Sequence, residues 1–67
     1  MKNKLKVERA KIDLTQEGLA NKIGVSRQTI NSIEKGRYIP STTIALKLSE
    51  VFKITVNEIF ELEDSDY

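Results

Sequence analysis

Apolar residues recur along this chain at intervals of three and four positions, the spacing that places side chains on one face of an α-helix. The longest such stripe comprises Ile44, Ala45, Leu48, Val51 and Phe52. Residues that cap helix N-termini precede four apolar segments, at Thr15, Ser26, Ser41 and Thr55. The pattern predicts an all-α chain without a sheet, with five helices over residues 3–12, 16–23 and 27–35, a stretch capped by Ser41, and residues 56–61.

Two of the predicted helices lie within residues 15–36 and are joined by a single tight turn. Gly24 provides the backbone freedom that ends the first helix, and Ser26 caps the second. Ile30 and Ile33 are the only large apolar residues of that second helix, so it buries one narrow edge. Two short helices joined by a glycine-containing turn predict a helix-turn-helix, a motif that places its second helix in the major groove of DNA.

The outward face of this second helix carries the candidate base contacts. Its residues are Arg27, Gln28, Thr29, Asn31 and Ser32. The face is rich in amides and hydroxyls, which both donate and accept hydrogen bonds, and it lacks the alternating Glu/Lys pattern of a merely solvated surface. We expect Arg27 to pair with guanine and Gln28 with adenine.

A second set of residues suits contacts with DNA phosphates, which position a protein without reading sequence. Gln16 stands in the first turn of a helix, where free backbone N–H groups attract anions, and its side-chain amide adds a donor. An alternative for Tyr38 is a ring packed over its own loop. The complete set of phosphate candidates is Gln16, Ser26, Gly36, Arg37, Tyr38 and Ser41.

The segments near the two ends give weaker signals. In the first helix, Leu5, Arg9 and Ile12 fall on one side at helical spacing. Residues 61–67 form an acidic tail, of which the stretch 63–66 is expected to fray. The N-terminal lysines are not followed by an apolar segment of the kind that a signal peptide requires, and no run approaches the ~20 apolar residues of a membrane span. We therefore expect a cytoplasmic protein.

Composition excludes several classes of function. The 67 residues suffice for a single domain with a thin core. The chain has no cysteine and no histidine, which argues against disulfides, zinc sites and Cys–His or Ser–His catalysis. The net charge of +1 conceals an asymmetry, since residues 1–37 carry +5 and residues 38–67 carry −4. The basic half contains the predicted helix-turn-helix, as a DNA-binding face requires.

The chain resembles the small regulators of the phage Cro and lambda-repressor type, often called Xre-like. The resemblance covers roughly residues 5–60 and depends on the order and spacing of several short motifs. These are Thr15-Gln16 with Leu19-Ala20, Gly24-Val25-Ser26, Ile30, Ile33-Glu34, Gly36, Pro40-Ser41, Ala45-Leu46-Lys47-Leu48 and Val56-Asn57-Glu58-Ile59-Phe60. It implies a compact five-helix DNA-binding domain, close to the stand-alone repressors that lack a separate ligand-binding domain.

The resemblance also implies roles for residues outside the recognition helix. Residues at the positions of Arg9 and Glu34 pair across the first and third helices, which would neutralise a carboxylate close to DNA. An exposed pair of this kind would contribute only about 0–1 kcal/mol. Some apolar residues near the C-terminal end are candidates for a two-fold dimer contact, namely Ile54, Val56 and Leu62.

These observations predict a homodimeric, sequence-specific DNA-binding repressor that reads a near-palindromic operator through the major groove. We expect no enzymatic activity, no metal or other cofactor, and no small-molecule ligand. The alternative is an antitoxin-like protein-interaction module, in which the acidic tail of residues 61–67 would bind a partner protein. A stoichiometric protein partner on purification would favour that alternative.

Overall fold

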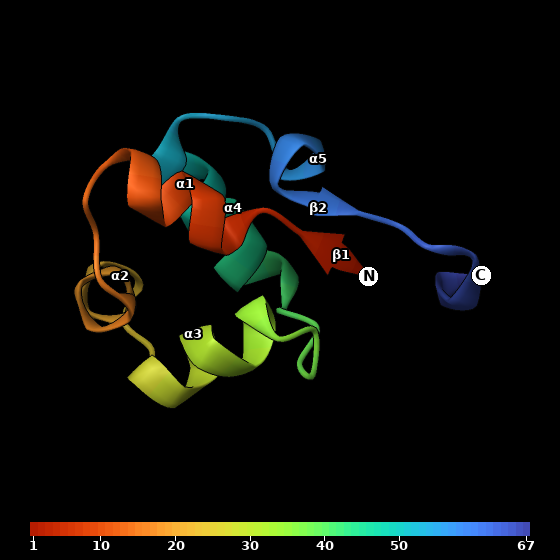
Figure 1. Cartoon of the computed structure of the whole chain (residues 1–67), viewed down its shortest axis with the longest axis horizontal. Coiled ribbons are helices and arrows are strands. Elements are labelled where there is room, and N and C mark those ends of the chain that lie inside the picture. Colours follow the sequence, from red (N-terminus) through yellow and green to blue (C-terminus); the bar gives the residue numbers. More distant parts are fainter.

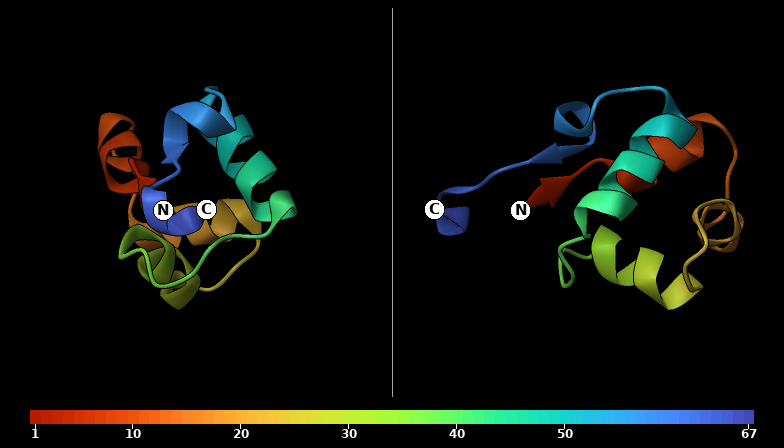
Figure 2. Two further views of the ribbon diagram at one scale, coloured as in Figure 1. Left: turned by 90° about the vertical axis from the view of Figure 1, so that its right-hand side faces the viewer. Right: turned by 180° about the vertical axis from the view of Figure 1, so that it is seen from behind.

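The computed structural model describes all 67 residues and contains the five predicted α-helices. They are α1 (Leu5–Lys11), α2 (Gln16–Ile23), α3 (Arg27–Glu34), α4 (Thr42–Phe52) and α5 (Val56–Ile59). Two short strands, β1 (Lys2–Asn3) and β2 (Phe60–Glu61), and a 3-10 helix at Asp64–Asp66 complete the chain. Helices α3 and α5 lie on opposite sides of the molecule (Figures 1 and 2). None of the helices is long and apolar enough to cross a membrane.

Side-chain caps fix the starts of four helices at the positions that the sequence predicts. Thr15 Oγ1 accepts a hydrogen bond from the Gly18 N–H at 2.9 Å, and Ser26 Oγ accepts one from Thr29 at 3.1 Å. Ser41 caps α4 in the same way. At α5, Thr55 forms a reciprocal capping box with Glu58. Because a cap residue contributes about 1 kcal/mol, these four residues stabilise helices that are individually too short to form alone.

The core contains side chains from all five helices. Six large apolar residues are fully buried, namely Leu5, Leu19, Ile30, Ile33, Leu48 and Ile59. Two of them belong to α3, which is therefore held along one edge while its remaining faces stay free. The rest of the predicted α4 stripe is half-buried and packs around this cluster.

The chain is mostly helical as predicted, but a short pair of strands near its two ends was not predicted. Strands β1 and β2 pair antiparallel, with Lys2 opposite Glu61 and Asn3 opposite Phe60. The first helix therefore begins at Leu5 and not at residue 3, and the last helix ends at Ile59 and not at residue 61. Two-residue strands are too short to show a period of two in the sequence, and their pairing depends on segments almost the whole chain apart.

The predicted inward face of the first helix is only partly correct. Leu5 is buried and Arg9 faces the protein, but the Ile12 side chain is 50% exposed. Helix α1 ends at Lys11, and Ile12 adopts a non-helical backbone with φ −115° and ψ 17°. Helical spacing therefore no longer determines the direction of its side chain.

The acidic tail makes contacts that the prediction of fraying did not include. The terminal ammonium of Met1 lies 2.9 Å from Glu63 Oε1 and 3.2 Å from Asp66 Oδ2. The Glu63 N–H also donates to Asp66 Oδ2 at 2.8 Å, which closes the 3-10 turn. Pairing of β1 with β2 brings these groups together, so the fold supplies a cationic partner that the local sequence lacks.

Candidate nucleic-acid interface

The turn between α2 and α3 sets the direction of the predicted recognition helix. Gly24 adopts a left-handed conformation with φ 74° and ψ 36°, and its N–H donates to Ala20 O. The next N–H, of Val25, donates to the same carbonyl at 3.0 Å. The chain therefore changes direction within two residues before Ser26 caps α3, as in a helix-turn-helix.

Helix α3 presents its polar residues outward, as its two buried isoleucines require. Arg27 and Gln28 are exposed, while Thr29, Asn31 and Ser32 are half-buried. Neither Arg27 nor Gln28 makes a side-chain hydrogen bond within the protein, whereas the hydroxyls of Ser26 and Thr29 bond one another at 2.9 Å. The N-terminal end of α3 therefore carries two long, free polar side chains.

The loop after α3 folds back beside this outward face. The N–H groups of Arg37 and Tyr38 donate to Ser32 O at 2.9 and 3.3 Å. Tyr38 thereby reaches the recognition helix, where a hollow of about 220 Å³ is lined by Gln28, Thr29, Ser32 and Tyr38. Tyr38 is 43% exposed, so its ring is accessible from solvent at this surface.

The backbone N–H of Gly36 already has a hydrogen-bond partner within the protein. Its N–H, a candidate phosphate donor, donates to Ile33 O at 3.0 Å. Gly36 adopts φ 72°, a conformation that favours glycine, at the point where the chain leaves α3. Its observed contribution is therefore to the path of the loop that carries Arg37 and Tyr38.

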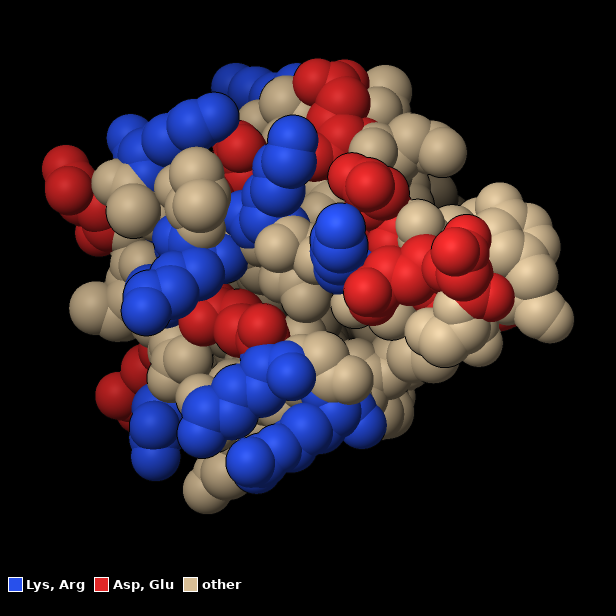
Figure 3. All heavy atoms as spheres, turned by 45° about the vertical axis from the view of Figure 1, so that its right-hand side comes forward, with Lys and Arg blue, Asp and Glu red and all other residues tan.

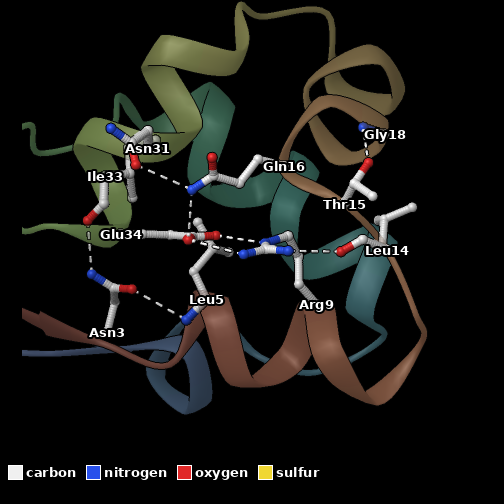
Figure 4. Close-up of polar contacts among 10 residues, drawn as sticks. All are labelled: Asn3, Leu5, Arg9, Leu14, Thr15, Gln16, Gly18, Asn31, Ile33 and Glu34. Carbon is white, nitrogen blue, oxygen red and sulfur yellow. Dashed lines mark hydrogen bonds and ion pairs between the residues drawn. The ribbon is translucent and has the colours of Figure 1, made fainter.

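A polar network joins helices α1, α2 and α3 and reaches the outward face of α3 at Asn31 (Figure 4). Arg9 Nε donates to Glu34 Oε2 at 2.7 Å, and Arg9 Nη2 donates to Glu34 Oε1 at 3.1 Å. The structure thus brings together the Arg9–Glu34 pair that the resemblance implies, with side chains only 14% and 7% exposed. Gln16 Nε2 donates to Glu34 Oε1 at 3.0 Å and to Asn31 Oδ1 at 3.2 Å.

The environment of Glu34 keeps its carboxyl group ionised. Burial opposes ionisation, but hydrogen bonds from Arg9 and Gln16 outweigh it and hold the pKa of Glu34 below its ordinary value. Arg9 is itself fixed by donation from Nη1 to Leu14 O at 2.8 Å. The carboxylate therefore links helices α1, α2 and α3.

The contact between Gln16 and Asn31 was not foreseen from the sequence. Both Nε2 protons of Gln16 are engaged, so its side chain is not free to donate to a phosphate in this arrangement. One signal was present, because Asn31 and Glu34 are three residues apart and so lie on the same side of a helix. A partner on α2 for both side chains follows only from the packing of α2 against α3.

Charge is distributed unevenly over the surface, in keeping with the sequence. In Figure 3, most Lys and Arg side chains lie on the left and along the lower edge of the molecule, with a few Asp and Glu side chains among them. The largest group of Asp and Glu side chains lies on the right. A basic surface of this kind attracts a polyanion.

Comparisons with a family profile and with known proteins indicate the same family. The helix-turn-helix family profile matches residues 5–59 of this chain. An HTH-type transcriptional regulator of Methanocaldococcus jannaschii is 54% identical over 66 residues, which cover 98% of this chain and 100% of the relative. The regulator YgzD of Bacillus subtilis is 44% identical over the same shares of the two chains.

Two solved structures resemble the fold closely. The SOS-response transcriptional repressor LexA from Eubacterium rectale superposes with a TM-score of 0.78 at 35% identity, covering 90% of this chain and 64% of that one. The restriction-modification controller protein C.AhdI from Aeromonas hydrophila gives 0.76 at 32% identity, covering 84% and 85%. This chain therefore belongs to the helix-turn-helix family of DNA-binding transcriptional regulators.

Proposed function

We propose that this regulator is a homodimeric repressor that reads a near-palindromic operator by inserting α3 into the major groove of each half-site. The observation that carries the proposal is the state of the N-terminal end of α3. Arg27 and Gln28 are exposed and have no partner within the protein, while Ile30 and Ile33 anchor the opposite edge of the helix. Direct readout of base edges needs polar side chains that are free to form hydrogen bonds and that project from a firmly held helix.

The base-reading set comprises Arg27, Gln28, Thr29, Asn31 and Ser32. Arg27 forks onto the O6 and N7 of guanine, and Gln28 makes a two-bond contact with adenine. Thr29 and Ser32 line the hollow beside Gln28, where a base edge fits between them and Tyr38. Asn31 lies farther along the helix and is held by Gln16.

Phosphate contacts on either side of the groove position α3. They come from the N-terminus of α2 at Gln16, from Ser26, from Arg37 and Tyr38 on the loop, and from the N-terminus of α4 at Ser41. Since the Gln16 side chain is engaged with Glu34, its phosphate contact is made by the backbone N–H. Gly36 supports this set through its backbone conformation.

The proposed dimer contact uses the apolar surface around α5. Ile54 and Val56 are half-buried, and the Leu62 side chain is 57% exposed. Val56 and Leu62 border a hollow of about 420 Å³ whose lining also includes Phe60. Because α5 lies opposite α3, a second copy on this surface leaves the recognition helix free (Figure 1). For both copies of α3 to enter successive major grooves on one face of DNA, the two-fold pair must place them about 34 Å apart, one turn of DNA.

In this proposal the protein acts by binding alone. A dimer bound to its operator blocks polymerase, and this needs no catalytic step, cofactor or effector. Because its proposed target is chromosomal DNA, we propose that it acts in the cytoplasm. The relatives named as transcriptional regulators support the proposal. In the antitoxin alternative the acidic tail would bind a partner protein, and two of its carboxylates, those of Glu63 and Asp66, are paired with the N-terminus.

The variant Gln28→Ala tests the reading role of α3. Gln28 is exposed and makes no side-chain hydrogen bond within the protein, so its loss should leave the melting temperature unchanged. Loss of a two-bond base contact costs about 1–3 kcal/mol at the cognate base, whereas binding to random DNA rests on phosphates. Competition of selected operator variants against random duplex measures both affinities.

A matched control removes an exposed amide from another helix. Asn21→Ala on α2 should change neither affinity nor sequence preference. If Gln28→Ala weakened operator and random DNA by the same factor, Gln28 would position the protein and would not read the sequence.

A further inference from the structure

Strand β1 connects two surfaces that the proposed function uses separately. It lies between β2 and the C-terminal end of α3 (Figures 1 and 2). On one side, Asn3 stands opposite Phe60 of β2, and the Lys4 N–H donates to Ile59 O at 2.8 Å. Phe60 lines the hollow at the proposed dimer surface. On the other side, the Asn3 side chain reaches α3.

The side-chain amide of Asn3 makes two hydrogen bonds that together fix its orientation (Figure 4). Its Nδ2 donates to Ile33 O at 2.9 Å, and its Oδ1 accepts from the Leu5 N–H at 3.1 Å. Because a carbonyl only accepts and an N–H only donates, the amide cannot turn over without losing both bonds. The bond to Leu5 therefore holds the Asn3 side chain in the direction that reaches α3.

Ile33 O belongs to the end of α3 from which the next loop starts. The last four carbonyls of a helix have no partner within that helix. Ile33 O accepts from the Gly36 N–H at 3.0 Å as well as from Asn3, and Ser32 O accepts from the Arg37 N–H at 2.9 Å. Asn3, which is 30 positions away along the chain, thus completes the cap that begins the loop carrying Arg37.

We infer that Asn3 is a positioning residue that fixes α3 relative to the proposed dimer surface. This inference rests on the proposed homodimer and on its entry into two half-sites. Apolar side chains such as Ile33 and Ile59 also link α3 to α5 through the core, but apolar packing is not directional, whereas a hydrogen bond has a preferred length and angle. A two-fold pair engages both half-sites only when its two copies of α3 keep a fixed separation. Freedom at the Asn3 bond therefore reduces what the second half-site adds to binding.

The test compares binding to duplexes that carry one half-site or two, with the operator first selected by the wild type from a random pool. Asn3→Thr suits a strand and keeps an acceptor for the Leu5 N–H, but its side chain is too short to reach Ile33 O. For the wild type, the second half-site should raise the affinity about 100-fold or more. In Asn3→Thr this gain should fall about tenfold, while the affinity for one half-site stays unchanged.

The spacing of the half-sites gives a readout that a purely structural role would not change. Insertion of one base pair between them rotates one half-site by about 35° and moves it by about 3.4 Å. The wild type should lose most of its gain on this duplex. Asn3→Thr should lose much less, because its two copies of α3 can adjust. A variant that had lost only stability would keep the wild-type dependence on spacing.

Two further variants serve as controls. Asn3→Ser removes the same bond with a smaller side chain, so it should repeat the effect of Asn3→Thr without the added methyl group. Asn21→Thr makes the same change at an exposed amide on α2 and should match the wild type. Sedimentation measures the dimer dissociation constant of each protein. A gain equal to that of the wild type in both Asn3 variants, or a loss explained fully by weaker dimerisation, would overturn the inference.

Hydrogen exchange without DNA separates failure of this inference from failure of the proposed function. NMR should show the backbone N–H groups of Gly36 and Arg37 exchanging about tenfold faster in Asn3→Thr than in the wild type. The Ile30 N–H, near the other end of α3, should exchange at the same rate in both proteins. Unchanged rates at Gly36 and Arg37 would overturn the inference even if α3 reads an operator. If the wild type gained nothing from a second half-site, the proposed homodimer would fall, and with it the coupling to a dimer surface.

Discussion

Glu34 places a negative charge on the helix that we propose to face DNA, and its neighbours prevent that charge from opposing binding. Its side chain is 7% exposed and lies 2.7 Å from Arg9. The Arg9–Glu34 pair is therefore less exposed to solvent than the surface ion pair that the sequence suggested. Removing one partner of a shielded pair leaves the other charge poorly solvated, which costs more than a surface pair contributes.

The stability of the protein should depend on Glu34 ionisation at acid pH. The pKa of Glu34 is lowered in the folded state, so its contribution is fully present above the ordinary carboxyl pKa of about 4.3 and is lost as the pH falls through the lower folded value. Glu34→Gln should lose about 2 kcal/mol at pH 7. Urea unfolding from pH 7 downward should show this difference shrinking below about pH 4.5. A difference that stayed constant with pH would contradict the role of the charge.

Gly24 should resist substitution for a purely conformational reason. A Cβ at this position would have no heavy atom within 4 Å, yet the backbone φ is +74°. Gly24→Ala should therefore cost about 1 kcal/mol through backbone strain alone. Gly24→Asn should cost less, because asparagine tolerates the left-handed region better. Thermal melts of both variants measure the effect, and equal losses would point to a cause other than backbone strain.

At the scale of elements, α4 ends in a conformation that its sequence does not favour. Lys53, its C-cap, adopts φ 56° and ψ 38°, and its N–H donates to Ser49 O. A lysine in this region bears a cost that glycine avoids, so Lys53→Gly should stabilise the protein by about 0.5 kcal/mol. The midpoint of urea unfolding should rise for Lys53→Gly and stay unchanged for Lys53→Ala. A lower midpoint for the glycine variant would contradict the assigned strain.

The elements that the sequence predicts well are those with local signals. Helix α2 has the predicted bounds, because Thr15 and Gly24 mark its ends chemically. Strands β1 and β2 were missed, since each is two residues long and is defined by a distant partner. Local capping chemistry can be recognised along the chain, whereas pairing between its ends cannot.

In the candidate site, too, some features can be predicted from the local sequence and others cannot. Exposure of Arg27 and Gln28 follows from the spacing of Ile30 and Ile33 and needs no tertiary information. The bond from Gln16 to α3 depends on how closely α2 approaches α3, which no spacing within one helix specifies. The sequence therefore predicts which side chains face outward but not which of them are held in place.

At the scale of the whole molecule, binding should depend strongly on salt. Each neutralised phosphate releases counterions and contributes about −0.9 to the slope of log affinity against log salt concentration. Arg37 is exposed on the loop beside α3, and Arg37→Ala in a dimer should make the slope shallower by about two such contributions. Titrations at several salt concentrations, on operator and on random duplex, measure the slope. A changed base preference would show that Arg37 reads sequence.

The pairing of β1 with β2 has a consequence for the order in which the molecule folds. Helices α2 and α3 are neighbours along the chain, and their contact closes only a short loop. The two strands instead join segments from opposite ends of the chain, so their pairing bears the largest entropic cost of loop closure. We expect this ladder to form last and to open first. When the β1–β2 pair opens briefly, the helix-turn-helix would stay folded. The DNA-binding surface would therefore persist in molecules whose two ends have separated.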